Sequence, residues 1–157
     1  MIKKLIVLVF GLLVLTGCLA NSSMKNNALN ETWTEEQQLY DALIQAKQDN
    51  FKNYYFIDLR NEVDYNESFI KGFLNESRTD LESFLEGVSK WNMIILMSGD
   101  TEKTSEAAAF VEGLGFYNVK SVSISFERLF AFFDAKDMMM QVTPGGDTCP
   151  IENPEGC

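Results

Sequence analysis

A short polar turn is the part of this sequence best suited to chemistry. The turn comprises Ser98, Gly99, Asp100, Thr101, Glu102 and Lys103, and it lies between an apolar run, 92–97, and a segment, 104–114, with apolar residues at helical spacing. The backbone N–H groups of such a turn, backed by the positive end of a helix dipole, can hold an anion or a developing negative charge. The turn offers a hydroxyl and an ammonium group, but no thiol.

The nucleophile that this turn offers, Ser98, has no evident base. The chain contains no histidine, which excludes Ser-His and zinc-histidine chemistry within one chain. Lys103 could serve as the base of a Ser-Lys pair, but a solvent-facing or anion-contacting lysine is the favoured interpretation. Asp100 and Glu102 place negative charge where an anionic substrate would approach. We therefore expect no catalytic residue, no metal and no cofactor.

The elements that must position the turn alternate between helix and strand. The apolar run 92–97 predicts a strand covered on both faces, with a buried helical turn as the alternative. We expect helices at 34–46, 79–88, 104–114 and 125–140, strands at 54–59, 92–97 and 119–124, and a capping box that begins at Thr34. This order predicts an α/β fold: a single domain with a central parallel sheet and helices on both faces.

The segment around the turn resembles the active-site element of rhodanese-like domains. In that family a cysteine is followed by a short loop containing glycine and arginine, two alanines and a final Gly-Phe. Counting back from Gly115 through Ala107 places Ser98 where the family has its persulfide-forming cysteine, and Lys103 where an arginine is usual. The resemblance thus implies a sulfurtransferase-like site that lacks its nucleophile, because a serine cannot store sulfur as a persulfide.

A second stretch, 56–75, carries the same resemblance more specifically. The residues Asp58-Leu59-Arg60 resemble the family's strand-ending Asp-x-Arg, and Tyr65, Ile70, Gly72 and Asn75 match its Glu-Tyr-x-x-Gly-His-Ile-Pro-Gly-Ala-x-Asn pattern in register. The usual Gly-His is Ser68-Phe69, and the usual proline is Lys71. The resemblance covers roughly 34–136. It implies that Asp58 and Arg60 support the turn as an ion pair, with a substrate-contacting Arg60 as the alternative.

The N-terminus has the pattern of a bacterial lipoprotein leader. Lys3 and Lys4 precede the apolar run 5–15, which is short for a membrane span. The residues Leu15-Thr16-Gly17-Cys18 match the lipobox, so resemblance to lipoproteins implies a diacylglycerol on Cys18, with an ordinary signal peptide as the alternative. Acyl chains would hold the domain to a membrane. This predicts a lipid-anchored, extracytoplasmic protein of the bacterial cell envelope, at the outer membrane or the cell membrane.

The remaining segments divide the chain as follows. Residues 1–17 are the expected signal peptide, 18–31 a flexible tether, 32–140 the rhodanese-like domain and 141–157 a tail rich in proline and glycine. In an exported chain, Cys149 and Cys157 are expected to form a disulfide. A redox pair or a relocated sulfur carrier is the alternative, but the spacing is not Cys-x-x-Cys and no basic side chain is adjacent.

Charge and the apolar stripe of the last segment bear on partners. The net charge of −10 argues against nucleic-acid binding and against adhesion to anionic lipid. Phe126, Leu129, Phe130 and Phe133 are expected to be core, with a partner-binding groove as the alternative for residues 132–133 and 138–140. The favoured function is an anchored binding module for an unknown protein partner. Residual transferase or hydrolase chemistry at Ser98 or Cys149, and a purely structural envelope role, are the alternatives.

Overall fold

The computed structural model describes residues 30–142 and the backbone of residues 148–150. Cys18, Cys157, the leader and the tether up to residue 29 lie outside this part, so the predicted lipid and disulfide are not addressed by it. In the described part no helix is long and apolar enough to cross a membrane.

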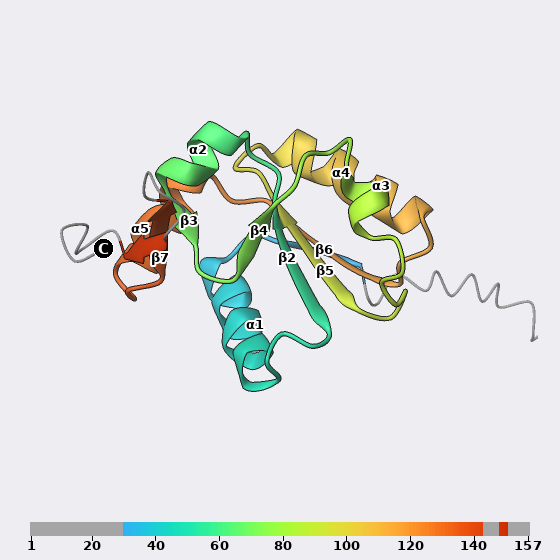
Figure 1. Cartoon of the computed structure of the whole chain (residues 1–157), viewed down its shortest axis with the longest axis horizontal. Helices are drawn as coiled ribbons and strands as arrows, with labels where there is room; N and C mark the ends of the chain where they lie inside the picture. Colours follow the sequence, from blue (N-terminus) through green and yellow to red (C-terminus); the bar gives the residue numbers. More distant parts are fainter. Residues whose placement is uncertain (1–29, 143–147, 151–157) are drawn as a thin grey trace, which may run out of the picture.

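The centre of the fold is a five-stranded sheet in which every neighbouring pair of strands is parallel. Its strand order is β1-β6-β5-β2-β4, with bounds Glu31–Trp33 for β1, Asn118–Val122 for β6, Met93–Met97 for β5, Tyr54–Asp58 for β2 and Phe73–Asn75 for β4. All five strands therefore begin at one edge of the sheet and end at the opposite edge (Figure 1). The predicted parallel α/β fold is confirmed.

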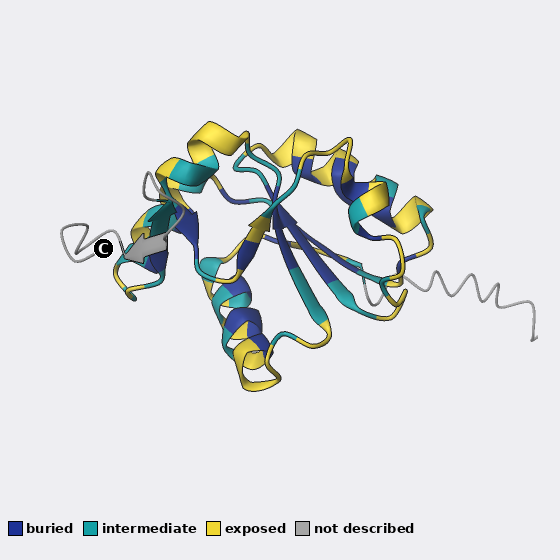
Figure 2. Ribbon diagram, in the orientation of Figure 1, coloured by how far each residue is buried: buried dark blue, intermediate teal, exposed yellow. Residues whose placement is uncertain are grey.

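Alternating side chains of the central strand β5 belong to two separate hydrophobic cores, one on each face of the sheet. Ile95 and Met97 pack on the side covered by α1 (Glu36–Gln48) and α5 (Phe126–Asp134), whereas Ile94 and Leu96 pack on the side of α3 (Leu81–Phe84) and α4 (Thr101–Gly113). All four are fully buried, which explains the continuous apolar run. The sheet is thus covered by helices on both faces, and its middle is the most buried region in Figure 2.

The first helix begins one residue later than its sequence pattern suggested. Glu35, not Thr34, is the N-cap residue, and the Gln38 side chain accepts the N–H groups of both. Leu39, Leu43 and Ala46 are buried as expected. The sheet also begins before the helix, because Glu31 to Trp33 pairs with β6 as strand β1.

The helix after the polar turn begins three residues earlier than expected. Helix α4 starts at Thr101, with Asp100 as N-cap, so Thr101, Glu102 and Lys103 form its first turn and only residues 98–100 are loop. The Asp100 carboxylate satisfies two N–H groups that would otherwise lack a partner, which stabilises the earlier start. At the other end, Gly115 has a positive φ of 89°, as expected for the residue after a helix.

The predicted last helix, 125–140, is wrong in its second half. Helix α5 ends at Asp134, and the chain turns at Asp137, which has a positive φ of 56°. Met139–Val142 then forms strand β7, which pairs antiparallel with β3 (Phe69–Ile70) and with β8 (Thr148–Pro150). Met139 is buried in the core beside α1 and α5. The tail thus begins with a second, small sheet.

Three short elements of the 56–75 region, helix α2 and strands β3 and β4, were not predicted as separate structure. Helix α2 spans Glu62–Glu67 and is capped by Asn61, whose side-chain oxygen accepts the Asp64 N–H. The expected helix at 79–88 is reduced to the single turn of α3, and Gly87, with φ of 78°, lies in the loop that follows.

Candidate functional site

The candidate site lies at the edge where the parallel strands end. Strand β2 ends at Asp58 and strand β5 at Met97, and the Leu59 N–H donates to the Met97 carbonyl at 2.7 Å, which holds the two strand ends together. Ser98 follows β5 directly, and Phe126 begins α5 after β6. Loops at this edge of a parallel sheet are the usual location of binding sites in α/β folds.

The hydroxyl of Ser98 is fully engaged by its own loop. It donates to the Asp100 carbonyl oxygen at 2.8 Å, accepts the Asp100 N–H at 3.1 Å, and lies 2.8 Å from the hydroxyl oxygen of Thr104. Thr104 is buried and also donates to the Asp100 carbonyl. The acceptors within reach of the Ser98 proton are the Asp100 carbonyl oxygen and the Thr104 hydroxyl oxygen, and neither is a base that could remove it.

The carboxylate of Asp100 occupies the N-terminus of α4. Its Oδ1 accepts the N–H groups of Glu102 at 3.0 Å and Lys103 at 3.1 Å. These are the N–H groups that would bind an external anion at the start of a helix. An aspartate at this position therefore acts as a built-in anion, and it opposes the approach of thiosulfate or phosphate by both occupancy and charge.

Gly99 lets the loop bend closely against α5. Its φ is +75°, and a Cβ added there would lie 3.0 Å from the Cβ of Phe126 and 3.2 Å from its backbone nitrogen. Only glycine fits such a position without strain.

The other polar residues of the turn are exposed or bonded to residues other than Ser98. Lys103 is exposed, and its Nζ lies 3.8 Å from Asp100 Oδ2. The Thr101 hydroxyl accepts a hydrogen bond from Ser123 at 3.2 Å, and Glu102 is exposed. Within the described part of the chain, the Ser98 hydroxyl is hydrogen-bonded to Asp100 and Thr104 and to no lysine, so the structure gives no support to a Ser-Lys pair.

Asp58 and Arg60 form a buried ion pair beneath the loop. Arg60 Nη2 lies 2.7 Å from Asp58 Oδ2, and the exposed fractions of the two side chains are 8% and 0%. The guanidinium also donates to the backbone carbonyls of Asp64 and Ser68 and stacks 3.4 Å from the centre of the Phe126 ring. Arg60 thus ties the end of β2 to helices α2 and α5.

The other motif residues of the 56–75 region support the same frame. The Asn75 side chain donates to the carbonyl oxygens of Asp58 and Arg60, and the Tyr65 hydroxyl donates to the Phe73 carbonyl at 2.8 Å. Burial, together with the nearby Asp58 carboxylate, raises the pKa of Tyr65 to about 12. The phenol therefore stays neutral and keeps its hydrogen bond.

Two substitutions relative to the family pattern have local structural partners. Phe69, where the family has histidine, stacks on Tyr65 with ring centres 4.5 Å apart. Lys71, where the family has proline, donates its backbone N–H to the Met138 carbonyl at 2.8 Å, a bond that a proline could not make.

A pocket of about 570 Å³ opens above Ser98, and its walls are acidic. It is lined by Arg60, Asp64, Glu67, Ser68, Ser98, Gly99, Asp100, Phe126, Glu127 and Phe130. The lining residues thus carry four carboxylates and one guanidinium, which Asp58 already neutralises, while the Lys103 ammonium lies 3.8 Å from Asp100. A hydrogen bond from its own backbone N–H, and another from Ser125, lower the pKa of Glu127, which keeps it charged. The pocket is suited to a cationic group and poorly suited to an anion.

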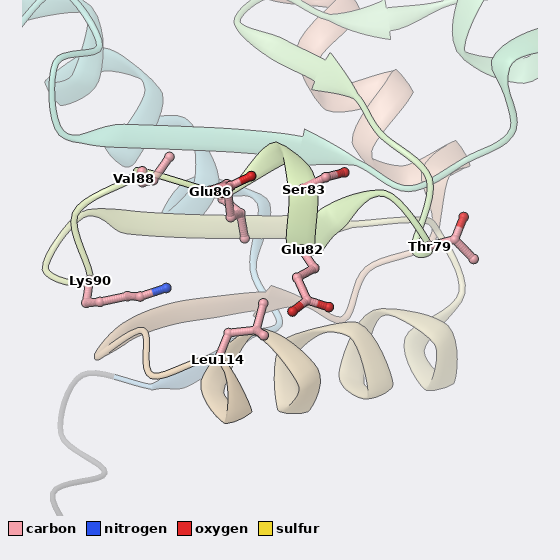
Figure 3. A pocket seen from close by; sticks show the side chains of 9 residues that line it. Thr79, Glu82, Ser83, Glu86, Val88, Lys90 and Leu114 are labelled. Carbon is pink, nitrogen blue, oxygen red and sulfur yellow. The ribbon is translucent and has the colours of Figure 1, made fainter.

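A larger hollow, of about 820 Å³, lies elsewhere and shows no comparable chemistry. It lies between the loop that leads into β5 and the end of α4, and Figure 3 shows Glu82 extending from α3 toward α4, with Lys90 and Leu114 on the other walls. Its walls combine exposed polar side chains with the core residue Leu85 and the half-buried Val88 and Leu114. The pocket at Ser98 is the better candidate because loop, helix terminus and ion pair converge there.

The described part of the chain contains no set of side chains that could bind a metal ion. No group of three or more histidine, cysteine, aspartate or glutamate side chains there is arranged to hold an ion. Cys149 lies in β8, where its backbone pairs with Gln141, but the position of its thiol is not described.

Comparison with known proteins establishes the class of fold. No protein-family model and no curated protein matches the sequence. Among solved structures, the chain is similar to the As-Sb reductase from Leishmania major, with 15% identity, a TM-score of 0.58, and coverage of 81% of this chain and 97% of that one. It is also similar to the Alr3790 protein from Anabaena sp., with 18% identity, a TM-score of 0.52, and coverage of 74% and 96%.

A domain of the Anabaena protein is described as rhodanese-like. The chain therefore has the rhodanese-like α/β fold, as its sequence motifs implied. At these identities the likeness defines the fold alone, and the chemistry must be argued from the residues of the pocket.

Part of the pocket was missed from the sequence. Asp64 and Glu67 lie on α2 and Glu127 lies on α5, so nothing in their spacing indicated that all three share a wall. Phe126 was expected to be core, but it is only half-buried and covers Arg60. The capping role of Asp100 did have a sequence signal, because aspartate is among the preferred N-cap residues.

Proposed function

We propose that this chain is a lipid-anchored, extracytoplasmic bacterial protein whose rhodanese-like domain has no sulfurtransferase activity and serves as a binding module. The observation that carries the proposal is the state of the loop at Ser98. At the position of the family's cysteine lies the Ser98 hydroxyl, which is hydrogen-bonded to the Asp100 carbonyl oxygen. The N-terminus of α4 behind it is occupied by the Asp100 carboxylate.

The geometry makes sulfur chemistry unfavourable on two counts. A sulfur carrier must be a thiolate, and no thiol lies at position 98. Even a thiol placed there would face the Asp100 carbonyl, which favours the protonated form, and would lie close to a carboxylate that repels an anionic donor. Loss of the nucleophile is therefore accompanied by a second change that disfavours the substrate.

The binding partner that fits the pocket is cationic. Asp64, Glu67, Asp100 and Glu127 surround the opening, and the half-buried rings of Phe126 and Phe130 supply apolar walls. A lysine or arginine side chain on an exposed segment of another protein would meet both requirements. The acidic lining therefore supports a protein partner that presents a basic side chain.

A sulfur-transfer assay with matched variants tests the missing activity. Residues 30–157 are compared with Ser98→Cys and with Ser98→Cys combined with Asp100→Ser, using thiosulfate and cyanide. We expect no turnover by the native domain, little by Ser98→Cys, and more by the double variant, because serine keeps a helix cap without the charge. Turnover by the native domain would refute the proposal and would direct attention to Lys103, Cys149 and Cys157 as reacting groups.

A crosslinking experiment tests the binding role. Intact cells carrying the native protein are compared with cells carrying Asp64→Asn, Glu67→Gln and Glu127→Gln together. We expect a specific crosslinked partner that is lost in the neutral variant, whereas Glu82→Gln with Glu86→Gln, in the other hollow, leaves it unchanged. Absence of any specific partner would favour a structural envelope role.

The anchor is tested separately on the exported protein. Replacing Cys18 with serine should abolish the mass added by the acyl chains and move the protein from the membrane fraction to the soluble one. A native protein without the added mass would instead indicate an ordinary signal peptide.

A further inference from the structure

Two aromatic side chains form an exposed pair at the edge of the sheet where the strands begin. Trp91 is 70% exposed and Tyr117 is 50% exposed, and their ring centres lie 4.6 Å apart. The other large exposed hydrophobic residues in the described part are the aliphatic Val63 and Leu74. The two rings are tilted by 37° to each other, and at this exposure much of their surface is left open to solvent in the described part of the chain.

The pair is held in place by the backbone of two loops. Trp91 precedes β5 and Tyr117 precedes β6, and the Tyr117 N–H donates to the Lys90 carbonyl at 3.0 Å. The surface is therefore part of the rigid sheet edge.

The chain leaves the described domain at this same edge. Strand β1 runs parallel to β6, with Glu31 opposite Lys120, so its start lies beside the start of β6. Asn30 is fixed there, because its side-chain oxygen accepts the Val119 N–H at 2.9 Å. Asn30 thus lies beside Val119, two residues after Tyr117, so the expected tether meets the domain close to the aromatic pair.

The length of chain before Asn30 limits how far this edge can lie from an anchor at Cys18. Residues 18–29 span at most about 40 Å when fully extended, and about 20 Å as an average chain. An anchored domain would therefore hold the edge with Trp91 and Tyr117 within reach of the lipid surface.

We propose that Trp91 and Tyr117 form a membrane-contact surface that inserts into the lipid headgroup region and orients the anchored domain. Tryptophan and tyrosine favour this region because each combines an apolar ring with a polar group. Lys52 is exposed in a loop at the same edge and can contact lipid phosphates, whereas the Lys90 ammonium packs over the Phe116 ring at 3.9 Å. The overall negative charge means that the contact relies on the rings and does not require anionic lipid.

The proposal fixes which way the acidic pocket faces. Each central strand has five residues, so the pocket edge lies roughly 16 Å beyond the aromatic edge. With the aromatic pair in the lipid surface, the opening at Ser98 points away from the membrane and toward partners in solution.

This inference rests on the lipid anchor of the proposed function, and fluorescence quenching tests it with the full chain. The acylated protein is purified from bacteria and placed in phosphatidylcholine vesicles with or without bromine on the upper acyl carbons, which quenches tryptophan only on contact. The native chain has two tryptophans, and Trp33 is 6% exposed. The variant Trp91→Phe therefore gives the signal of Trp33 alone, and subtraction gives that of Trp91.

We expect brominated lipid to quench Trp91 about two-fold and to leave Trp33 nearly unchanged. Replacing Tyr117 with serine should weaken the quenching of Trp91, whereas Val63→Ser, on α2, should not. Flotation with the vesicles without quenching of Trp91 would overturn the contact surface while the anchor stands. Failure to float, or flotation that survives Cys18→Ser, would overturn the anchor and with it this inference. Burial of Trp91 that depends on protein concentration and not on lipid would overturn it in favour of self-association.

Discussion

Replacing Asp100 should expose the helix terminus that its carboxylate now occupies. The variant Asp100→Ala removes the oxygen that accepts the Glu102 and Lys103 N–H groups. Loss of an N-cap costs about 1 kcal/mol, and loss of a negative charge at a helix N-terminus costs about 0.3–1 kcal/mol. The ion pair with Lys103 is exposed and adds little. We expect the free energy of unfolding to fall by about 1–2 kcal/mol.

Asp100→Asn is the matched control, because asparagine keeps an accepting oxygen and removes only the charge. It should cost about 0.3–1 kcal/mol. The assay is urea unfolding of residues 30–157 in a low-salt buffer, followed by thermal unfolding with and without sulfate.

Added sulfate should rescue the alanine variant specifically. If the opened terminus binds sulfate with a dissociation constant of about 10 mM, then about 100 mM sulfate returns about 1.4 kcal/mol, or roughly 4 °C in Tm. Sulfate stabilises proteins in general, so the measured quantity is the gain of Asp100→Ala over the native protein. Equal gains in native, asparagine and alanine proteins, or an alanine variant as stable as the native one, would refute the role of Asp100 as a built-in anion.

Three further perturbations follow from the same frame. Because folding raises the Tyr65 pKa from 10 to about 12, the neutral phenol stabilises the fold fully below pH 10, and this stabilisation is lost as pH rises toward 12. After allowance for solvent screening, the free energy of unfolding in urea should fall by about 1–2 kcal/mol more for the native domain than for Tyr65→Phe across this interval. Arg60→Met should cost about 3–5 kcal/mol in the same assay because it leaves Asp58 charged and buried, and adding Asp58→Asn should recover part of the loss; an Arg60→Met domain of native stability would contradict the structural role. Gly99→Ala should cost at least about 1 kcal/mol more than Gly87→Ala, since both positions have positive φ but only the first would bring a Cβ against Phe126; equal losses would show that the contact is unimportant.

The parts of the fold that the sequence predicted are those with strong local patterns. Residues 93–97 form a continuous apolar strand because both faces are covered, and the helix with Leu39, Leu43 and Ala46 shows regular spacing on one buried face. Both were correctly assigned because their burial is encoded within a single window of residues.

The missed elements obtain their structure from distant partners. Strand β1 has only three residues, two of them exposed, and it exists because β6 offers an open edge. Strand β7 interrupts what looked like a continuing helix, since Phe69 and Ile70 provide antiparallel partners for Met139 and Met140. Short strands of this kind contain too few side chains to show a recognisable pattern in the sequence.

The candidate site likewise has a part that the sequence predicted and a part that it did not. Ser98 and the ion pair beneath it could be placed because they fall at motif positions. The acidic wall could not, because Asp64 and Glu67 come from α2 while Glu127 comes from α5, and only folding brings them to one opening.

Strand β1 gives the domain a defined response to mechanical tension. A partner held at the pocket edge and a lipid anchor reached through Asn30 would pull on opposite ends of the sheet, along the strand direction. The backbone bonds between β1 and β6, the Thr32–Ser121 hydroxyl contact and the Asn30–Val119 bond would then be loaded together, in shear, instead of opening one after another. Under the proposed anchoring, β1 would therefore carry the load between membrane and partner, and its bonds to β6 would resist unfolding under tension.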